Sequence, residues 1–232
     1  MTQKQRNALI AGVIAVVLVA IVGIGWAVQS NRDTSGDAAD RPGDKSSETT
    51  AREVKVAAEG DYGLGVGDPD APVKVEIFED FQCGHCADFK KAANDDLLAA
   101  AQDGSAYVIY RPMAFLNEWS MRAMNAFGVV LDEAGAEAAL QLHDLLFANQ
   151  PSGTVPSNDE IVALAVEAGA SESDVRKGIE DLSFQQWVVN ATDDASKRGV
   201  TGTPTVFVNG EAVGGQTIEE LTANTFKGID AG

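Results

Sequence analysis

The pattern of hydrophobic and polar positions begins with an uninterrupted apolar run at residues 8–28, ALIAGVIAVVLVAIVGIGWAV, which contains no charge. A helix of about 20 apolar residues is long enough to cross the hydrocarbon core of a bilayer. Lys4 and Arg6 precede the run and no acid does, and positive flanks stay in the cytoplasm. The pattern therefore predicts a cytoplasmic tail at residues 1–7, a transmembrane anchor at residues 8–28, and a chain that lies outside the cytoplasm from there on.

A cleaved signal peptide is the alternative for this run. The apolar region of a signal peptide usually has about 7–15 residues and is followed by an A-x-A-like cleavage site. Here the run is longer, and the VQSNR that ends it offers no such site. We favour an uncleaved anchor, and both interpretations export the rest of the chain.

The next stretch is polar. Residues 29–53 are rich in Ser, Thr, Asp and Gly, and Ala is their only aliphatic residue. Such a segment buries too little apolar surface to offset the entropy of ordering it. We predict a flexible linker over residues 29–60 and one domain over residues 61–232, with the folded part beginning near Val54 or Tyr62.

The pattern at the start of this domain alternates between strand and helix. A β-rich run predicts a strand at Val73–Glu79, and spaced apolar residues among good helix formers predict a helix at Cys86–Ala101. A second strand follows at Ala106–Met113. Residues 118–182 then read as helical, and Ser157 and Glu160 form a capping box that opens one of the helices.

The domain ends on a helix, a hairpin and a helix. The helix is predicted at Phe184–Lys197 and the first strand of the hairpin at Thr205–Val208. Asn209 and Gly210 form the turn to a return strand, and Thr217 caps the last helix. The early β-α-β unit should place two parallel strands side by side and the hairpin should close the sheet, which indicates an α/β fold.

The net negative charge argues against two classes of binding partner. The formal net charge of the 232 residues is −18, and the part beyond the anchor is more acidic still, because Lys4 and Arg6 precede every acid. An acidic surface argues against nucleic-acid binding and against docking on anionic lipid headgroups. We interpret the charge as a contribution to solubility.

Both cysteines lie in the stretch FEDFQCGHCADF, residues 78–89. A disulfide between them would close a very small loop and would constrain the unfolded chain little. A structural zinc site usually needs four Cys or His ligands. The chain has two of each; His85 lies between the cysteines, and His143 lies in the helical block, where a packed or solvated histidine is the usual case. We therefore predict no metal.

A redox role remains. A C-x-x-C motif that follows a strand and opens a helix is typical of thioredoxin-like redox sites. The helix N-terminus favours the Cys83 thiolate, and a protonated His85 would add a second stabilising charge. Cys86, one turn further on, can resolve a mixed disulfide.

Four stretches carry a resemblance to a known family: GDPDAPVKVEIFEDFQCGHC, YRPM, LHDLLFANQ and GTPTVFVNG. On these the chain resembles the DsbA-like thiol–disulfide oxidoreductases, in particular their membrane-tethered bacterial branch, over about residues 65–226. The resemblance implies a thioredoxin fold with a helical insertion at about residues 115–182 and no cofactor. It also implies that Cys83 attacks and Cys86 resolves.

The same resemblance implies a substrate-binding loop at Gly202, Thr203 and Pro204. A cis bond before Pro204 is expected from the family alone, because most X-Pro bonds are trans. The Thr203 backbone would then pair with an extended client strand near the attacking sulfur.

The chain departs from the family in two places. Gly84 follows the first cysteine, where many members have proline. Ile77 stands six positions before that cysteine, where many thioredoxin-fold proteins bury an acid. Glu76, Glu79 and Asp80 lie nearby; we interpret them as a solvated strand end and assign no proton acceptor to Cys86.

The predicted function is disulfide donation to exported proteins that contain cysteines. Export places the site outside the reducing cytosol, and a histidine between the cysteines favours an oxidising potential. Isomerase or reductase activity is the alternative. A non-catalytic client-binding module is an alternative of another class, against which the intact dithiol argues. The resemblance also implies a membrane reoxidising partner, either DsbB-like or vitamin K epoxide reductase-like, and a single-pass location in the cell membrane.

Overall fold

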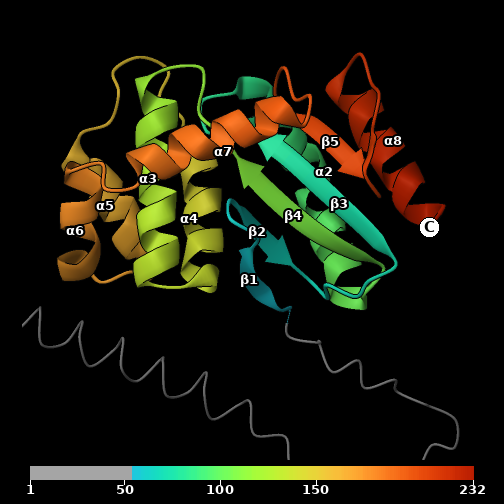
Figure 1. Cartoon of the computed structure of the whole chain (residues 1–232), viewed down its shortest axis with the longest axis horizontal. Helices are drawn as coiled ribbons and strands as arrows, with labels where there is room; N and C mark the ends of the chain where they lie inside the picture. The colour runs from blue at the N-terminus through green and yellow to red at the C-terminus, as the bar shows by residue number, and fades with distance from the viewer. Residues whose placement is uncertain (1–53) are drawn as a thin grey trace, which may run out of the picture. The chain divides into compact units, whose positions relative to one another are not determined.

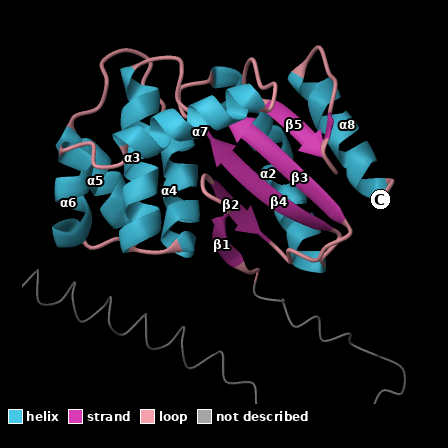
Figure 2. Cartoon of the chain, in the orientation of Figure 1, coloured by secondary structure: helices cyan, strands magenta, loops and turns pink. Residues whose placement is uncertain are grey.

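The computed structural model describes residues 54–232, so the predicted tail and anchor, and most of the predicted linker, lie outside the described residues. Within residues 54–232, no helix is long and apolar enough to cross a membrane. Six strands form one sheet in the order β1-β2-β4-β3-β5-β6 (Figures 1 and 2). The strands are β1 (Val56–Glu59), β2 (Gly63–Val66), β3 (Val73–Glu79), β4 (Ala106–Pro112), β5 (Thr205–Val208) and β6 (Glu211–Ala212).

The centre of the sheet is the predicted parallel pair. β3 and β4 lie side by side from Val73 opposite Ala106 to Glu79 opposite Pro112. β2 and β5 flank this pair and run antiparallel to it. The α/β prediction is confirmed, and the carboxyl ends of β3 and β4 lie together at one edge of the sheet.

Two helices cover one face of the sheet. α2 (Gly84–Asp103) packs against β4, α8 (Ile218–Asp230) packs against β5, and the two helices contact each other. Helix α2 buries the apolar positions expected from the sequence, Phe89, Ala93 and Leu97. A short segment that carries Cys83 joins β3 to α2, so the cysteines lie where the strand leads into this helix.

Four consecutive helices that follow β4 form the insertion. They are α3 (Glu118–Glu133), α4 (Ala136–Ala148), α5 (Asn158–Glu167) and α6 (Glu172–Glu180), and they gather on one side of the sheet (Figure 1). α7 (Gln185–Lys197) follows and contacts α3. The predicted capping box of Ser157 and Glu160 is present at the start of α5. The thioredoxin-like fold with a helical insertion is therefore confirmed.

The described structure begins at Val54, the earlier of the two starts expected for the folded part. Residues 56–59, placed in the linker by their sequence, form β1 and pair with β2. β2 was missed because its glycines have low β-propensity. A Cβ on Gly65 would lie 1.9 Å from the Tyr107 hydroxyl, and one on Gly63 would lie 2.6 Å from an Arg111 nitrogen. These glycines leave room for the large polar side chains of β4.

The predicted Asn-Gly hairpin is also present. Asn209 and Gly210 have φ values of 50° and 84°, the left-handed conformations that a tight two-residue hairpin turn requires. The Asn209 side chain accepts a hydrogen bond from the Lys74 backbone N–H at 2.8 Å, which ties the turn to β3. The return strand, β6, has only two residues.

Candidate active site

Cys83 is the N-cap residue of α2. Its backbone N–H donates to the Asp80 carbonyl at 2.8 Å, and its carbonyl accepts from the N–H groups of Cys86 at 3.1 Å and Ala87 at 3.2 Å. The first turn of the helix therefore presents its remaining N–H groups beside the Cys83 sulfur. Both cysteines are free thiols in this structure.

The surroundings of Cys83 favour its thiolate. They lower its pKa to about 6, chiefly through a hydrogen bond from the Cys86 thiol, against which partial burial acts. Thr203 and the backbone N–H groups of Cys86 and His85 add to the lowering. A thiol with this pKa is mostly ionised at neutral pH, and the thiolate is the nucleophilic form.

Cys86 has the opposite character. Its side chain is almost completely enclosed, with 1% of the residue exposed against 8% for Cys83. Burial, followed by its hydrogen bond and charge interaction with Cys83, raises the pKa of Cys86. One sulfur is thus ionised and closer to solvent, while its neighbour is protonated and enclosed.

The loop before β5 lies against this pair. The Thr203–Pro204 peptide bond is cis, as the family resemblance implied. The Thr203 carbonyl oxygen lies 3.3 Å from the Cys83 sulfur and accepts a hydrogen bond from it when the thiol is protonated. The Gly202 carbonyl accepts a hydrogen bond from the Thr205 hydroxyl at 2.7 Å, which stabilises the bend of the loop. The structure therefore brings Thr203 and Pro204 to the cysteines, and Gly202 contributes to the shape of the loop.

The Thr203 hydroxyl is a further feature of this contact. Its oxygen is buried and has no hydrogen-bond partner within the described part of the chain. It lies near enough to the sulfurs to lower the pKa values of both Cys83 and Cys86. A buried hydroxyl without a fixed partner is free to donate to a thiolate.

His85 lies at the surface of the first turn of α2. Its side chain is 78% exposed, and its Nδ1 lies 4.0 Å from the Asp88 carboxylate. The part of His85 that favours the Cys83 thiolate is its backbone N–H. The main chain of His85 thus contributes to the stabilisation, and the contribution of a protonated ring stays a prediction.

The interpretation of the three nearby acids as a solvated strand end is wrong. Glu76, Glu79 and Asp80 are 8%, 3% and 0% exposed, because each has polar partners inside the protein. Glu76 accepts hydrogen bonds from Arg111 at 3.0 Å and Arg198 at 2.8 Å. Burial opposes its ionisation, but the two arginines outweigh burial and lower its pKa.

Asp80 and Glu79 lie at the end of β3 and are held separately. The Asp80 carboxylate accepts backbone N–H groups from Gln82 at 2.8 Å, Phe115 at 3.1 Å and Leu116 at 3.4 Å. Glu79 forms a short contact with Nε2 of His143. Both Asp80 oxygens and the Glu79 oxygen that contacts His143 therefore have partners other than the sulfurs.

The sequence analysis missed three polar side chains of the insertion that contact the active-site segment. His143 is fully buried against Glu79, and Trp119 and Gln150 donate to backbone carbonyls of this segment. A signal was available for His143, since it shares the buried face of α4 with Ala139, Leu142 and Leu146 at the spacing of a core stripe. A histidine on such a stripe needs a buried polar partner.

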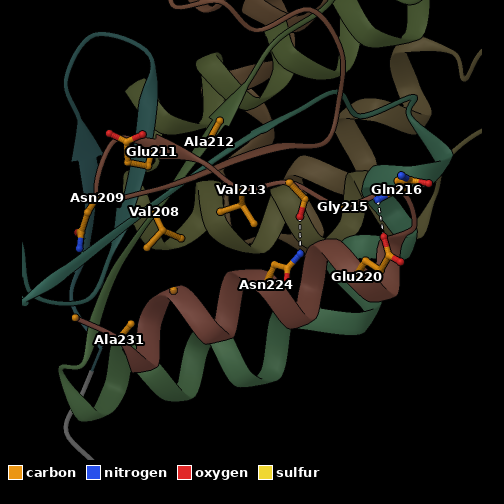
Figure 3. A pocket seen from close by; sticks show the side chains of 13 residues that line it. Val208, Asn209, Glu211, Ala212, Val213, Gly215, Gln216, Glu220, Asn224 and Ala231 are labelled. Atoms are coloured by element: carbon orange, nitrogen blue, oxygen red, sulfur yellow. Dashed lines mark hydrogen bonds between the residues drawn. The ribbon is translucent and has the colours of Figure 1, made fainter.

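A groove of about 860 Å³ opens beside the start of α2 and the loop of Thr203 and Pro204, although neither cysteine lines it. Its lining includes His85, Asp88, Lys91, Thr203 and Pro204. A second pocket, of about 680 Å³, lies between the β5–β6 hairpin and α8 and has no cysteine or histidine in its lining (Figure 3). The first is therefore the candidate place for a substrate. Residues 54–232 contain no cluster of ligands suited to a metal ion.

Comparison with known proteins agrees with this geometry. The family model described as Thioredoxin matches residues 60–224. The Na(+)/H(+) antiporter NhaA 3 of Salinispora tropica is 30% identical over 167 residues, which are 68% of this chain and 23% of the antiporter. The chain thus spans about a quarter of the length of the curated relatives it matches, and their transport activity is not carried over to it.

Solved structures give the branch of the family. Reduced DsbA from Mycobacterium tuberculosis is 25% identical with a TM-score of 0.58, covering 77% of this chain and 96% of that one. MdbA from Actinomyces oris, a thiol-disulfide oxidoreductase, is 29% identical with a TM-score of 0.58, covering 70% of this chain and 83% of that one. With the paired thiols at the start of α2 and the loop of Thr203 and Pro204 against them, these similarities show that the chain belongs to the thioredoxin family, within its DsbA-like thiol–disulfide oxidoreductases.

Proposed function

We propose that this chain donates a disulfide to exported proteins through a mixed disulfide on Cys83. The observation that carries the proposal is the asymmetry of the dithiol, in which the pKa of Cys83 is lowered to about 6 while that of the buried Cys86 is raised. Cys83 is the cysteine whose sulfur lies within hydrogen-bond distance of the Thr203 carbonyl, at 3.3 Å. The asymmetry supports a division of roles between the two sulfurs.

The donation proceeds in two exchanges. A client thiolate attacks Cys83 in the oxidised protein, the Cys83–Cys86 bond breaks, and the Cys86 sulfur leaves with the electron pair and takes up a proton. A second client thiolate then attacks the client sulfur of the mixed disulfide, and Cys83 leaves as a thiolate. The client dithiol loses two electrons and two protons in forming its disulfide; the protein gains the two electrons, Cys86 takes one proton, and the other passes to solvent while Cys83 stays a thiolate. A low pKa makes Cys83 the better leaving group in the second exchange.

The same electrostatics support the oxidising direction. The Cys83 thiolate is stabilised only when the Cys83–Cys86 bond is open, so its environment favours the reduced protein and therefore release of the disulfide. The Cys-Gly-His-Cys sequence of the site keeps isomerase or reductase activity as a second candidate. A measured potential separates these, since known potentials run from about −270 mV for thioredoxin to −120 mV for DsbA.

Exposed apolar side chains near the site support an unfolded protein as the client. Phe115 and Leu116, each 47% exposed, lie on the loop whose N–H groups the Asp80 carboxylate binds. The Asp80 carbonyl accepts the N–H of Cys83, so one residue holds both the apolar pair and the attacking cysteine. Cysteines are among the most buried residues of folded proteins, so an unfolded client presents them beside apolar neighbours.

We further propose that residues 8–28 anchor the protein in the cell membrane with the catalytic domain outside the cytoplasm. This proposal is supported by the apolar run and its basic flank. The enzyme must be reoxidised after each donation, and an anchor would keep it near a membrane oxidase of the DsbB-like or vitamin K epoxide reductase-like class.

The test of the proposed function is the reduction potential of the full-length protein in detergent, measured by equilibration with glutathione buffers. We expect a value nearer −120 mV than −270 mV, together with catalysed oxidation of a reduced, unfolded protein. A potential near that of thioredoxin would overturn donation and favour a reductase. Absence of any exchange would favour a binding module.

A further inference from the structure

The chain between β3 and α2 is held by side chains of the helical insertion. The Phe81 carbonyl accepts hydrogen bonds from Nε1 of Trp119 at 3.2 Å and from Nε2 of Gln150 at 2.9 Å. The same Gln150 nitrogen donates to the Cys83 carbonyl at 3.1 Å. Trp119 lies on α3, and Gln150 follows the end of α4, so both donors come from outside the sheet and its covering helices.

These bonds supply what the local backbone lacks. Phe81 is fully buried and belongs to no strand or helix, so its carbonyl has no partner in a sheet ladder or helix, and buried backbone carbonyls require one. The contact also runs in the other direction, since Nε2 of Gln82 donates to the Pro151 carbonyl at 3.4 Å. The two segments are therefore joined by reciprocal side-chain-to-backbone bonds.

From these contacts we propose that Gln150, assisted by Trp119, is a positioning residue through which the helical insertion sets the reactivity of Cys83. The proposal rests on the attacking role proposed for Cys83. Within residues 54–232 the Gln150 amide donates to the Phe81 and Cys83 carbonyls, and it acts through them rather than on a sulfur. Its amide fixes the direction in which the chain enters α2.

That direction determines the donors available to the sulfur. The N–H groups of His85 and Cys86 favour the Cys83 thiolate only while the first turn of α2 faces it. Loss of the Gln150 amide leaves the Cys83 carbonyl with its helical donors alone and the Phe81 carbonyl with Trp119 alone. The segment then gains freedom, the N–H groups lose alignment, and the Cys83 thiol becomes less acidic and the protein less oxidising.

Three variants of the full-length protein test this. Gln150→Ala removes the side chain, Gln150→Glu keeps its length but replaces the donor by a carboxylate, and Trp119→Phe keeps an aromatic ring but removes the Nε1–H together with part of the buried indole. We expect the alkylation rate of Cys83 at pH 6.5 to fall about three- to tenfold in the Gln150 variants, as loss of one or two hydrogen bonds implies. Gln150→Glu should have the larger effect because it adds a negative charge near the thiolate. The glutathione equilibrium should move toward the protein disulfide by a similar factor.

Asn149 provides a matched control. It is the neighbouring amide, but it is exposed and its Nδ2 donates only to the Leu145 carbonyl at the end of α4, at 2.8 Å. Asn149→Ala should therefore leave the alkylation profile and the potential unchanged. Equal shifts in Asn149→Ala and Gln150→Ala would overturn the proposal.

Thermal unfolding separates positioning from general stability. A Gln150 variant that melts at a lower temperature but keeps the wild-type alkylation profile and potential would also overturn the proposal. If Gln150→Ala does not fold, Gln150→Glu and Trp119→Phe decide by the same two readouts. If the Gln150 shift appears but the wild-type protein oxidises no client, positioning stands and disulfide donation fails, so the two proposals can be judged apart.

Discussion

The Thr203 carbonyl oxygen lies 3.3 Å from the Cys83 sulfur, although 120 positions separate the two residues in the chain. β5 pairs with β3 in the sheet, with Thr205 opposite Phe78. This pairing brings the loop before β5 to the segment that follows β3. The geometry of the dithiol therefore depends on the sheet as well as on the C-x-x-C motif, and a change in either partner should alter the other's chemistry.

Replacement of Thr203 by valine tests this dependence. Valine matches threonine in shape but removes the buried hydroxyl, which helps to lower the pKa of Cys83. We expect Thr203→Val to raise that pKa toward the ordinary thiol value and to make the protein less oxidising. Because the hydroxyl has no partner within the described residues, the oxidised form should lose little stability. The measurements are the pH dependence of alkylation and the unfolding midpoint of the oxidised protein; an unchanged alkylation profile would remove the hydroxyl from the mechanism.

The stability of the reduced protein should depend on pH in a defined direction. The pKa of Cys83 is about 6 in the folded protein and lies near the ordinary thiol value of about 9 in the unfolded chain. A lowered folded pKa contributes stability above the unfolded value, and that contribution is lost as pH falls through 6. The free energy of unfolding of the reduced form, relative to the oxidised form, should therefore rise by about 2–3 kcal/mol between pH 5 and pH 8.

Urea denaturation of both redox forms at pH 5, 6.5 and 8 measures this difference. The oxidised form, which has no free thiol, is the control for other titrating groups. A difference that is flat over this range would contradict the low pKa of Cys83. A difference that falls with rising pH would mean that the thiolate is destabilised in the fold.

The two cysteines should behave differently when replaced one at a time. Cys86→Ala leaves Cys83 able to exchange with a disulfide but removes the sulfur that resolves the product, so mixed disulfides with exported proteins should accumulate. Cys83→Ala should trap little, because the remaining Cys86 is buried and its pKa is raised. Non-reducing electrophoresis of cell envelopes, with mass identification of the adducts, makes the comparison. Equal trapping by both variants would show that the attacking role has been assigned to the wrong sulfur.

Removal of the exposed apolar side chains should weaken the binding of a protein client more than that of a small dithiol substrate. Phe115→Ser and Leu116→Ser should raise the KM for a reduced, unfolded protein severalfold, since each removes apolar surface available to the client. The potential and the turnover of a small dithiol should stay at wild-type values.

Val189→Ser is the matched control for this surface. Val189 is 39% exposed and lies on α7, outside the loop bound by Asp80. It should leave the KM for the unfolded protein unchanged. A similar rise in KM for all three variants would indicate a general effect of surface hydrophobicity rather than a contact site.

The elements nearest the cysteines were predictable because their signals are local. β3 and β5 occupy the residues expected from their alternation and turn signals, and the Cys83–Cys86 spacing placed the dithiol at a helix start. β1 and β2 were not predictable in this way. Gly63 and Gly65 lack the side chains that mark a strand, and the reason for them is the space taken by Arg111 and Tyr107 on another strand.

The surroundings of the site could not be predicted from the residues that form the motif. Whether Glu79 and Asp80 are solvated or buried depends on a helix and a loop that come later in the chain. The buried state of Glu79 is set by His143, 64 positions away. That of Asp80 is set partly by the backbone of Phe115. Alternation along a strand predicts which side chains share a face, but it does not predict which residues of other elements pack against that face.

The contact between Glu79 at the end of β3 and His143 on α4 makes the insertion an integral part of the enzyme rather than a detachable module. A shortened protein in which residues 115–182 are replaced by a tight turn would keep both cysteines and all six strands. It would lose α4, whose His143 contacts Glu79 and packs on Phe81 and Tyr110, so the carboxylate and these two aromatic side chains would be exposed to solvent. Minimisation of this scaffold would therefore have to replace the uncovered aromatic side chains by polar ones at the same time, and transfer of the Cys-Gly-His-Cys segment to another scaffold would have to transfer its helical partners as well.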